Sequence, residues 1–222
     1  MGVIESIELD FPEGKVRYGN LICPAPHNLT QRHGTKLMAA TALLASAGLP
    51  SRSWEGIRLT ADAFGKPLLS TDTGSSPVVS FSWEGDRLWA ALSLDCRRLG
   101  IDAALPRDFA PRYPFARAFG DREGERLSTL CDHDSSRRAA MLWSAKEAVV
   151  KMLGCGFHLF DPGDVVATVL GKGESAWHSD VTVSNGAKVR NVRVYSIEQS
   201  WGWISFALGN EEDRPYRDLE GI

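Results

Sequence analysis

The sequence predicts an α+β fold built from two similar halves. One observation is a long amphipathic stretch, residues 141–153, whose apolar residues recur at the spacing of one helical face. A second is a hairpin pattern, in which two apolar runs flank the turn at 84–87. A third is the likeness of residues 81–94 to residues 195–208, each a strand, a turn and a strand with aromatic residues. We interpret this likeness as a weak internal duplication of an α+β unit.

Composition limits the classes of protein to consider. The chain has 222 residues, 43% of them hydrophobic, which suffices for one large domain or two small ones. The formal net charge is -3, whereas a general nucleic-acid binder normally carries a basic excess. Four widely spaced cysteines argue against a zinc site or a disulfide scaffold and favour a reducing compartment. With no signal-peptide pattern or long apolar run, we expect a cytoplasmic protein without nucleic-acid or membrane partners.

Five stretches of the first half are expected to form strands, because apolar residues alternate or cluster there between turn residues. They are residues 3–10, 54–60, 78–83, 88–94 and 98–102. Prolines and glycines in residues 12–26 are expected to break up any long element. A helix then follows the capping residues 28–30 and ends near residues 48–50. The last strand ends on Asp102, and a strand end is a typical place to present a chemical group.

The second half reads as two helices followed by strands. Three prolines in residues 103–116 mark a boundary, so we expect an N-terminal lobe of residues 1–104 and a C-terminal lobe of residues 105–222. The first helix is expected at 119–130, and the second runs to Leu153, where glycines stop it. The expected strands are 165–170, 179–184, 189–197 and 201–208, and the last dozen residues are polar and expected to be loosely held.

Two helices carry charged residues with more than one interpretation. Trp143, Glu147 and Lys151 are spaced four residues apart and share the polar side of the long helix. Such a carboxylate–ammonium pair is common on surfaces, so this stretch alone favours a solvated pair. Arg32 and Lys36 lie near the start of the first helix, where cations oppose the helix dipole. A surface role tolerates this, and an anionic ligand docked beside the helix start also explains it.

Two blocks of sequence form a specific pair. Residues 99–102 read Leu-Gly-Ile-Asp, and about forty residues later residues 143–151 read Trp-Ser-Ala-Lys-Glu-Ala-Val-Val-Lys. Together they resemble the signature of the 4′-phosphopantetheinyl transferases, with every fixed position of the longer block filled. Further landmarks occur in order: residues 65–67 (Gly-Lys-Pro), the strand at 80–82, Phe119 with Glu123, and residues 154–157. The resemblance spans about residues 30–208 and is closest to the surfactin-synthetase type, which implies a monomer of two pseudo-symmetric lobes with the active site between them.

This resemblance implies an enzyme that transfers 4′-phosphopantetheine from coenzyme A to a serine of an acyl or peptidyl carrier protein. It implies that Asp102 and Glu147 bind a magnesium ion, which prefers carboxylate and phosphate oxygens and waters. Glu147 or a metal-held water would take the serine proton, and Lys151 would stabilise the phosphates. The residues that the resemblance assigns to coenzyme A are Arg32, Lys36, Lys66, Ser82, Trp83 and Lys151.

Two positions depart from the family pattern. The family usually reads Asp-x-Glu with the glutamate as a third metal ligand, whereas Ala104 stands there in this chain. A water could fill that ligand position. The family usually has Ser-His in the strand before the hairpin, whereas this chain has Ser82 and Trp83, and an indole donates one hydrogen bond but carries no charge. These departures leave an alternative open: a weakened or inactive homologue that binds coenzyme A or a carrier protein without transfer.

Overall fold

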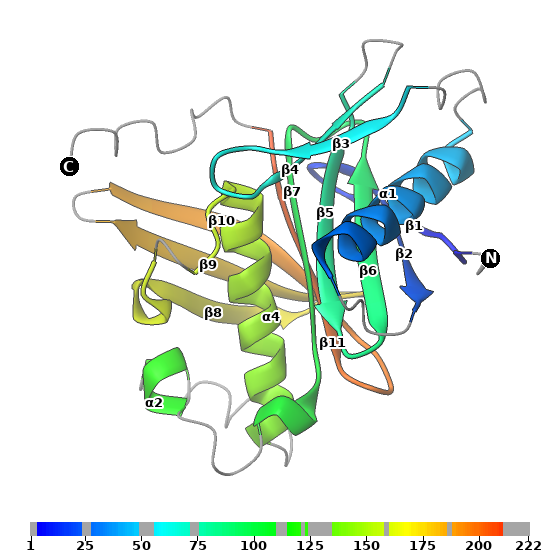
Figure 1. The fold of residues 1–222 in the computed structure, drawn as a ribbon. Helices are drawn as coiled ribbons and strands as arrows, with labels where there is room; N and C mark the ends of the chain where they lie inside the picture. Colours follow the sequence, from blue (N-terminus) through cyan, green and yellow to red (C-terminus); the bar gives the residue numbers. More distant parts are fainter. Residues whose placement is uncertain are drawn as a thin grey trace.

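The computed structural model describes residues 4–23, 28–48, 56–71, 76–109, 115–120, 123, 135–157, 160–185 and 188–210. Within these ranges it confirms the α+β fold class, with two helices of 18 and 19 residues packed on antiparallel sheets (Figure 1). None of the described helices combines the length and the apolar character needed to cross a membrane.

The first sheet has four strands in the order β1–β2–β6–β5, and each neighbouring pair is antiparallel. The strands are β1 Ile7–Phe11, β2 Gly14–Ile22, β5 Val78–Glu84 and β6 Arg87–Ser93. The hairpin expected at 84–87 is confirmed, because Glu84 pairs with Arg87 and Gly85 has a φ of 59° in the turn. Helix α1, Leu29–Ser46, covers this sheet, and the side chain of Asn28 caps it by accepting from the Gln31 N–H.

Strand β2 corrects one expectation from the sequence. Residues 12–26 were expected to break up any long element, yet nine of them, Gly14–Ile22, form a strand. The glycine inside it serves a close approach of two chain segments rather than a turn. A Cβ at Gly19 would come within 2.5 Å of the Ile4 side chain, so glycine lets the preceding segment cross the strand. Beside this sheet, β3 Arg58–Ala61 and β4 Pro67–Ser70 form a two-stranded ribbon.

The second sheet has five antiparallel strands in the order β7–β11–β10–β9–β8. Their bounds are β7 Arg98–Ala104, β8 Val165–Lys172, β9 Trp177–Asn185, β10 Lys188–Glu198 and β11 Trp203–Gly209. Helix α4, Ser135–Leu153, lies on this sheet, and short turns η2 Pro106–Phe109, α2 Phe115–Ala118 and η3 Pro162–Asp164 surround it. The helix expected at 119–130 lies mostly outside the described residues, as do the last dozen residues.

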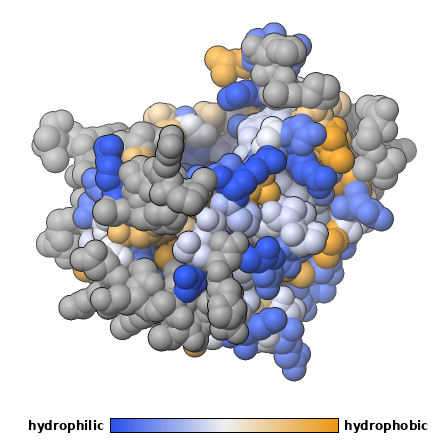
Figure 2. Space-filling model, turned by 90° about the horizontal axis from the view of Figure 1, so that it is seen from below, coloured by the Kyte–Doolittle hydropathy of each residue, from blue (hydrophilic) through white to orange (hydrophobic). Residues whose placement is uncertain are grey.

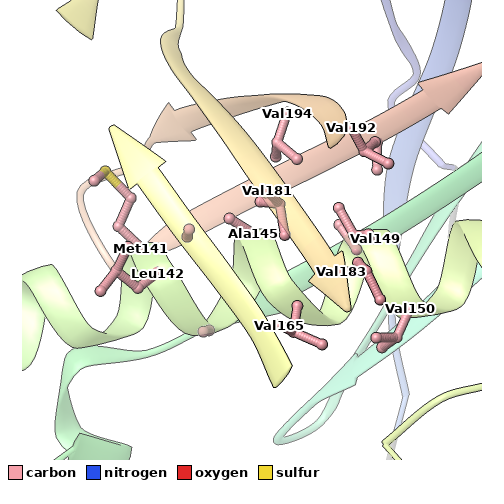
Figure 3. Close-up of a cluster of buried hydrophobic side chains, with 14 of the residues drawn as sticks. Met141, Leu142, Ala145, Val149, Val150, Val165, Val181, Val183, Val192 and Val194 are labelled. Atoms are coloured by element: carbon pink, nitrogen blue, oxygen red, sulfur yellow. The ribbon is translucent and has the colours of Figure 1, made fainter. Parts of the chain in front are cut away.

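Helix α4 is held by a valine-rich core. Its buried face meets side chains from three neighbouring strands, which point toward the helix in Figure 3. The labelled members are Met141, Leu142, Ala145, Val149 and Val150 from the helix and Val165, Val181, Val183, Val192 and Val194 from β8, β9 and β10. β-Branched residues suit the strands, and the apolar residues of the helix recur at helical spacing, so the apolar face predicted for residues 141–153 is confirmed.

A second core joins the two sheets face to face. Phe206 of β11 is fully buried there and contacts the rings of Tyr18 and Phe11, at centroid distances of 5.0 and 5.8 Å. A third core fills the space between α1 and the first sheet, with Leu43 and Leu88 among its members. The two sheets are therefore one packed body, with α1 and α4 on their outer faces (Figure 1).

Strand β7 lies at the seam between the halves. It is hydrogen-bonded to β11 of the second sheet, while its other edge runs beside β5 of the first sheet. Two serine hydroxyls of β5 accept backbone N–H groups of β7 across this seam. Ser80 Oγ accepts from Ile101 at 3.1 Å, and Ser82 Oγ accepts from Ala103 at 3.3 Å. β7 therefore lies between strand β5 of the first sheet and the central helix α4 of the second half.

The described surface carries apolar side chains in separate places. In the space-filling view of one face, hydrophilic residues are interspersed with small apolar groups (Figure 2). The exposed large apolar residues belong to several elements, for example Leu29 on α1, Leu68 on β4 and Leu170 on β8. Single exposed apolar residues of this kind are normal for a folded domain.

Candidate active site

The contact between β7 and α4 depends on one glycine. A Cβ at Gly100 would lie 1.9 Å from the Ala148 carbonyl oxygen and 2.7 Å from the Met152 nitrogen. Glycine therefore allows the strand to pass directly against the helix backbone. Asp102 is two residues further along the strand, so it lies on the same face and also points toward α4. The Leu-Gly-Ile-Asp block thus places a carboxylate beside the helix.

Asp102 is the buried centre of this site. The Lys151 ammonium donates to its Oδ1 at 2.6 Å, and the Ser82 hydroxyl donates to the same oxygen at 2.7 Å. Only 8% of the Asp102 side chain is exposed, against 26% for Lys151. Burial raises the pKa of Asp102, and Lys151 and then Ser82 oppose that shift. The solvated Glu–Lys pair that the helix alone favours is therefore corrected: Lys151 pairs with Asp102 across the seam.

Glu147 lies one helical turn before Lys151, in reach of the Asp102 charge. The pKa of Glu147 is raised to about 7, mainly by burial and then by the negative charge of Asp102, while Lys151 opposes the shift. A carboxylate with this pKa can accept a proton near neutral pH. The helix periodicity places Glu147 and Lys151 on the same side of α4. Gly100 lets β7 lie against the helix, so Asp102 lies beside them.

This donor set fits a hard divalent cation. The carboxylates of Asp102, which is buried, and Glu147, which is partly buried, repel each other here, and a cation between them would remove that repulsion. Within the described ranges, no three His, Cys, Asp or Glu side chains gather closely enough to form a complete metal cage. Mg²⁺ needs no such cage, because it keeps several waters and binds through one or two carboxylates plus substrate phosphates.

Lys36 of α1 lies near Lys151, and Arg32 lies one turn before Lys36 on the same helix. Burial lowers the pKa of Lys36, and the positive charges of Lys151 and then Arg32 lower it further. The Lys36 ammonium also lies 5.6 Å from the centre of the Phe81 ring on β5. Like charges held together in this way favour an anionic ligand, which would relieve the repulsion. The structure therefore brings Lys36 toward the site that Asp102, Glu147 and Lys151 form, whereas Arg32 is exposed one turn away on α1.

Lys66, just before β4, contacts the C-terminal end of α4 rather than the part that carries Glu147. Its ammonium donates to the Met152 carbonyl at 3.1 Å, and its stem covers Gly154, where a Cβ would meet it at 2.9 Å. Burial lowers its pKa, with Arg98 as the next cause. Lys66 thus binds the carbonyl end of the helix, a position that suits a cation because of the helix dipole. Its contact with a ligand remains a prediction.

Ser82 and Trp83 point to opposite sides of β5, as neighbouring strand residues do. Ser82 faces Asp102, as described above. Trp83 is half-buried and packs against the core under α1. Its indole Nε1 is buried and finds no hydrogen-bond partner among the described residues. A buried donor without a partner costs free energy, and this one lies on the side of β5 away from Asp102, so the structure does not bring Trp83 to the site.

Sequence reasoning missed Glu84 near this site. Burial raises its pKa to about 7, with Asp108 as the next cause, and Asp102 also raises it. Arg107 opposes the shift, because its guanidinium lies 3.9 Å from the Glu84 carboxylate. The alternation of strand residues could have indicated that Glu84 lies near the site, because Ser80, Ser82 and Glu84 share one side of β5. That side faces the seam with β7.

Lys146 fixes the helix from the other side. Its side chain is fully buried, and its ammonium donates to Glu123 Oε2 at 2.8 Å, the Ala118 carbonyl at 2.7 Å and the Pro162 carbonyl at 3.2 Å. The lysine of the Lys-Glu pair is thus a structural anchor, and the glutamate after it faces the site.

The match to known proteins covers this same part of the chain. No curated protein matches the sequence. The model of one family, described as the 4′-phosphopantetheinyl transferase superfamily, matches residues 98–195. The matched range contains β7 with Asp102 and α4 with Glu147 and Lys151. Residues 98–195 therefore form a domain of the 4′-phosphopantetheinyl transferase superfamily.

Proposed function

We propose that this protein transfers 4′-phosphopantetheine from coenzyme A to a serine of an acyl or peptidyl carrier protein, with Mg²⁺ as cofactor. Phosphopantetheine transfer is the activity of the superfamily whose model matches residues 98–195. The observation that carries the proposal is the meeting of Asp102, Glu147 and Lys151 at the seam, where two carboxylates and an ammonium are partly or fully withdrawn from water.

Asp102 and Glu147 would hold the metal ion, and Lys151 would contact the phosphates. When bound, the ion would offset the negative charge of the pyrophosphate. Lys151 carries the positive charge nearest to Asp102, so it can stabilise charge that develops on the leaving nucleotide. Lys36 and Arg32 support this proposal because their charges act on the same region.

Glu147 would accept the proton of the carrier serine. The serine oxygen forms the new phosphate ester, the pyrophosphate bond of coenzyme A breaks, and adenosine 3′,5′-bisphosphate leaves. The pKa of about 7 suits this role, because a general base works best when its pKa lies near the working pH. Trp83 stands where the family usually has a histidine, and its indole N–H is buried under α1, on the side of β5 away from Asp102.

The direct test is a transfer assay with purified protein, coenzyme A, Mg²⁺ and a panel of apo carrier proteins, read by intact mass. We expect the mass of one phosphopantetheine on at least one carrier, and its loss after chelation of the metal. Glu147→Gln should lower the rate by about 100-fold or more, as removal of a general base does. Glu174→Gln, on the exposed turn between β8 and β9, is the matched control and should transfer normally. Failure with a broad panel would contradict the proposal.

A binding protein without transfer is the second candidate, and Ala104 favours it because a third acidic ligand is missing there. Calorimetry separates the two candidates. Coenzyme A binding that does not depend on Mg²⁺, in a protein that modifies no carrier, would favour binding alone. Binding strengthened by Mg²⁺ together with carrier modification would favour the transferase.

A further inference from the structure

Ser82 makes a contact that the coenzyme A role does not require. Its hydroxyl is buried and donates to Asp102 Oδ1 at 2.7 Å. The Ser82 Oγ also accepts the Ala103 N–H, at 3.3 Å. A hydroxyl has one proton to donate, and here Asp102 takes it. That proton is therefore already engaged on a carboxylate rather than offered to a phosphate oxygen.

The contact determines how the carboxylate is presented. Both side-chain hydrogen bonds to Asp102, from Ser82 and from Lys151, fall on Oδ1, and Oδ2 receives neither. They come from two different elements, β5 and α4, so together they fix the rotation of the carboxylate plane. A ligand held in this way binds metal more tightly, because less freedom is lost when the metal arrives.

Strand β5 supplies a matched comparison. Ser80 and Ser82 lie on the same side of the strand, and both are buried at the seam. Each accepts one backbone N–H of β7, from Ile101 and Ala103 respectively. Ser82 alone of these two also donates to a carboxylate. The two residues therefore share the structural role in the seam and differ in the contact with Asp102.

We propose that Ser82 is a positioning residue, whose hydroxyl holds Asp102 Oδ1 so that Oδ2 faces the metal. This inference rests on the proposed function, because it assigns Asp102 to the metal. It gives Ser82 a role different from the coenzyme A contact that the family resemblance implies. It also gives the first sheet a part in the metal site, since β5 reaches across the seam to orient a ligand of the second.

The test measures metal and coenzyme A binding separately. Mn²⁺ binding is followed by electron paramagnetic resonance in the presence of coenzyme A, and coenzyme A binding is followed by calorimetry without metal. Ser82→Ala should weaken Mn²⁺ binding by about tenfold, as loss of a group that orients a metal ligand does. Ser82→Thr, which keeps the hydroxyl, should restore most of it. Coenzyme A binding without metal should change by less than about twofold in either variant.

Ser80→Ala is the matched control, because it removes the same kind of seam hydrogen bond without touching Asp102. It should leave Mn²⁺ affinity within about twofold of the parent protein. Equal weakening by Ser80→Ala and Ser82→Ala would overturn the proposal, because the effect would then belong to the seam. Unchanged Mn²⁺ affinity in Ser82→Ala would also overturn it. Weaker coenzyme A binding without metal would identify Ser82 as a phosphate contact instead.

Separate controls test whether each variant folds and whether the proposed function holds. Thermal unfolding followed by circular dichroism shows whether each variant is folded. If Ser82→Ala does not fold, Ser82→Cys replaces it, since a thiol has similar size but donates weakly, and it should weaken Mn²⁺ binding as well. If the parent protein binds Mn²⁺ but modifies no carrier, the proposed function fails while the role of Ser82 is still decided by the same titrations. A parent protein that binds no Mn²⁺ overturns both.

Discussion

Charged side chains at the seam are held in the folded protein at a cost. Transferring a carboxylate out of water is unfavourable unless another charge or hydrogen bond replaces the solvent. Asp102 has Lys151 and Ser82 as replacements, whereas Glu147 has the electrostatic effect of Lys151, without a hydrogen bond to it, and the repulsion of Asp102. Such arrangements are common at functional sites, where perturbed pKa values serve chemistry or ligand binding.

Glu84 allows the cost of one such group to be measured through pH. Its pKa is raised to about 7 from an ordinary value of 4.5, and 14% of its side chain is exposed. The folded state therefore holds the Glu84 proton more tightly than the unfolded state does. Stability from this group is fully present below about pH 4.5 and is lost as the pH rises toward 7. At pH 8 the charged carboxylate destabilises the fold.

We expect Glu84→Gln to remove the loss of stability that accompanies ionisation of Glu84 at high pH. The variant should be more stable than the parent protein at pH 8 by up to about 3 kcal/mol, since one pKa unit corresponds to about 1.4 kcal/mol. The two should be close in stability near pH 4.5, and urea denaturation at both pH values measures the difference. Glu174→Gln, at an exposed turn, controls for the loss of one negative charge. An equal effect of Glu84→Gln at both pH values would contradict the assignment.

At the scale of single residues, the sequence indicated the groups whose type and spacing carry the signal. Glu147 and Lys151 follow from helical spacing, and Asp102 follows from its place at a strand end and from the family resemblance. Glu84 did not follow, because its pKa depends first on burial and then on Asp108 and Asp102, all of which other parts of the chain bring about. The bond from Ser82 to Asp102 likewise joins two strands that do not pair in one sheet.

At the scale of elements, α4 is fixed on two sides by different forces. The valine-rich core holds one side, and the buried ion pair of Lys146 and Glu123 holds another. Glu123 also accepts the backbone N–H groups of Gly120 and Ala167 at 2.8 Å. The pair therefore ties α4 to β8 and to the chain before the helix, which sets the rotation of the face that carries Glu147.

We expect Lys146→Met to destabilise the protein by about 3–5 kcal/mol, because it leaves the Glu123 charge buried without its cation. The methionine fills a similar volume, so the loss is electrostatic rather than a cavity. Urea denaturation measures the free energy of unfolding. Adding Glu123→Gln to Lys146→Met should recover part of the loss, since it removes the uncompensated charge. A Lys146→Met protein as stable as its parent would show that the pair contributes little.

The sequence predicted the helices and strands whose pattern lies within one stretch of residues. It missed β2, whose conformation depends on a contact with another segment of the chain. The helix at α4, the hairpin of β5 and β6 and the strands of the second sheet follow from patterns within each stretch. Strand β2 was not expected, because Gly19 was interpreted as a breaker when it serves the crossing of Ile4. A sequence pattern does not show which glycine faces another chain segment.

At the scale of the whole molecule, the two halves depend on each other. Strand β7 pairs in the second sheet, contacts β5 of the first and lies against α4, so the site exists only when both halves are in place. The core between the sheets draws aromatic residues from both, including Phe11, Tyr18 and Phe206. Two lobes that share a core and a strand in this way should unfold together.

Phe206→Ala tests this shared stability. Phe206 has no exposed surface and contacts both Tyr18 and Phe11, so its truncation should cost about 3–5 kcal/mol. Because the lost contacts join the two sheets, tryptophan fluorescence and far-ultraviolet circular dichroism should shift to the same lower urea midpoint. Phe64→Ala, at a residue exposed between β3 and β4, is the control and should leave that midpoint nearly unchanged. Separate midpoints for the two probes would show that the halves unfold independently and that the seam contributes little to stability.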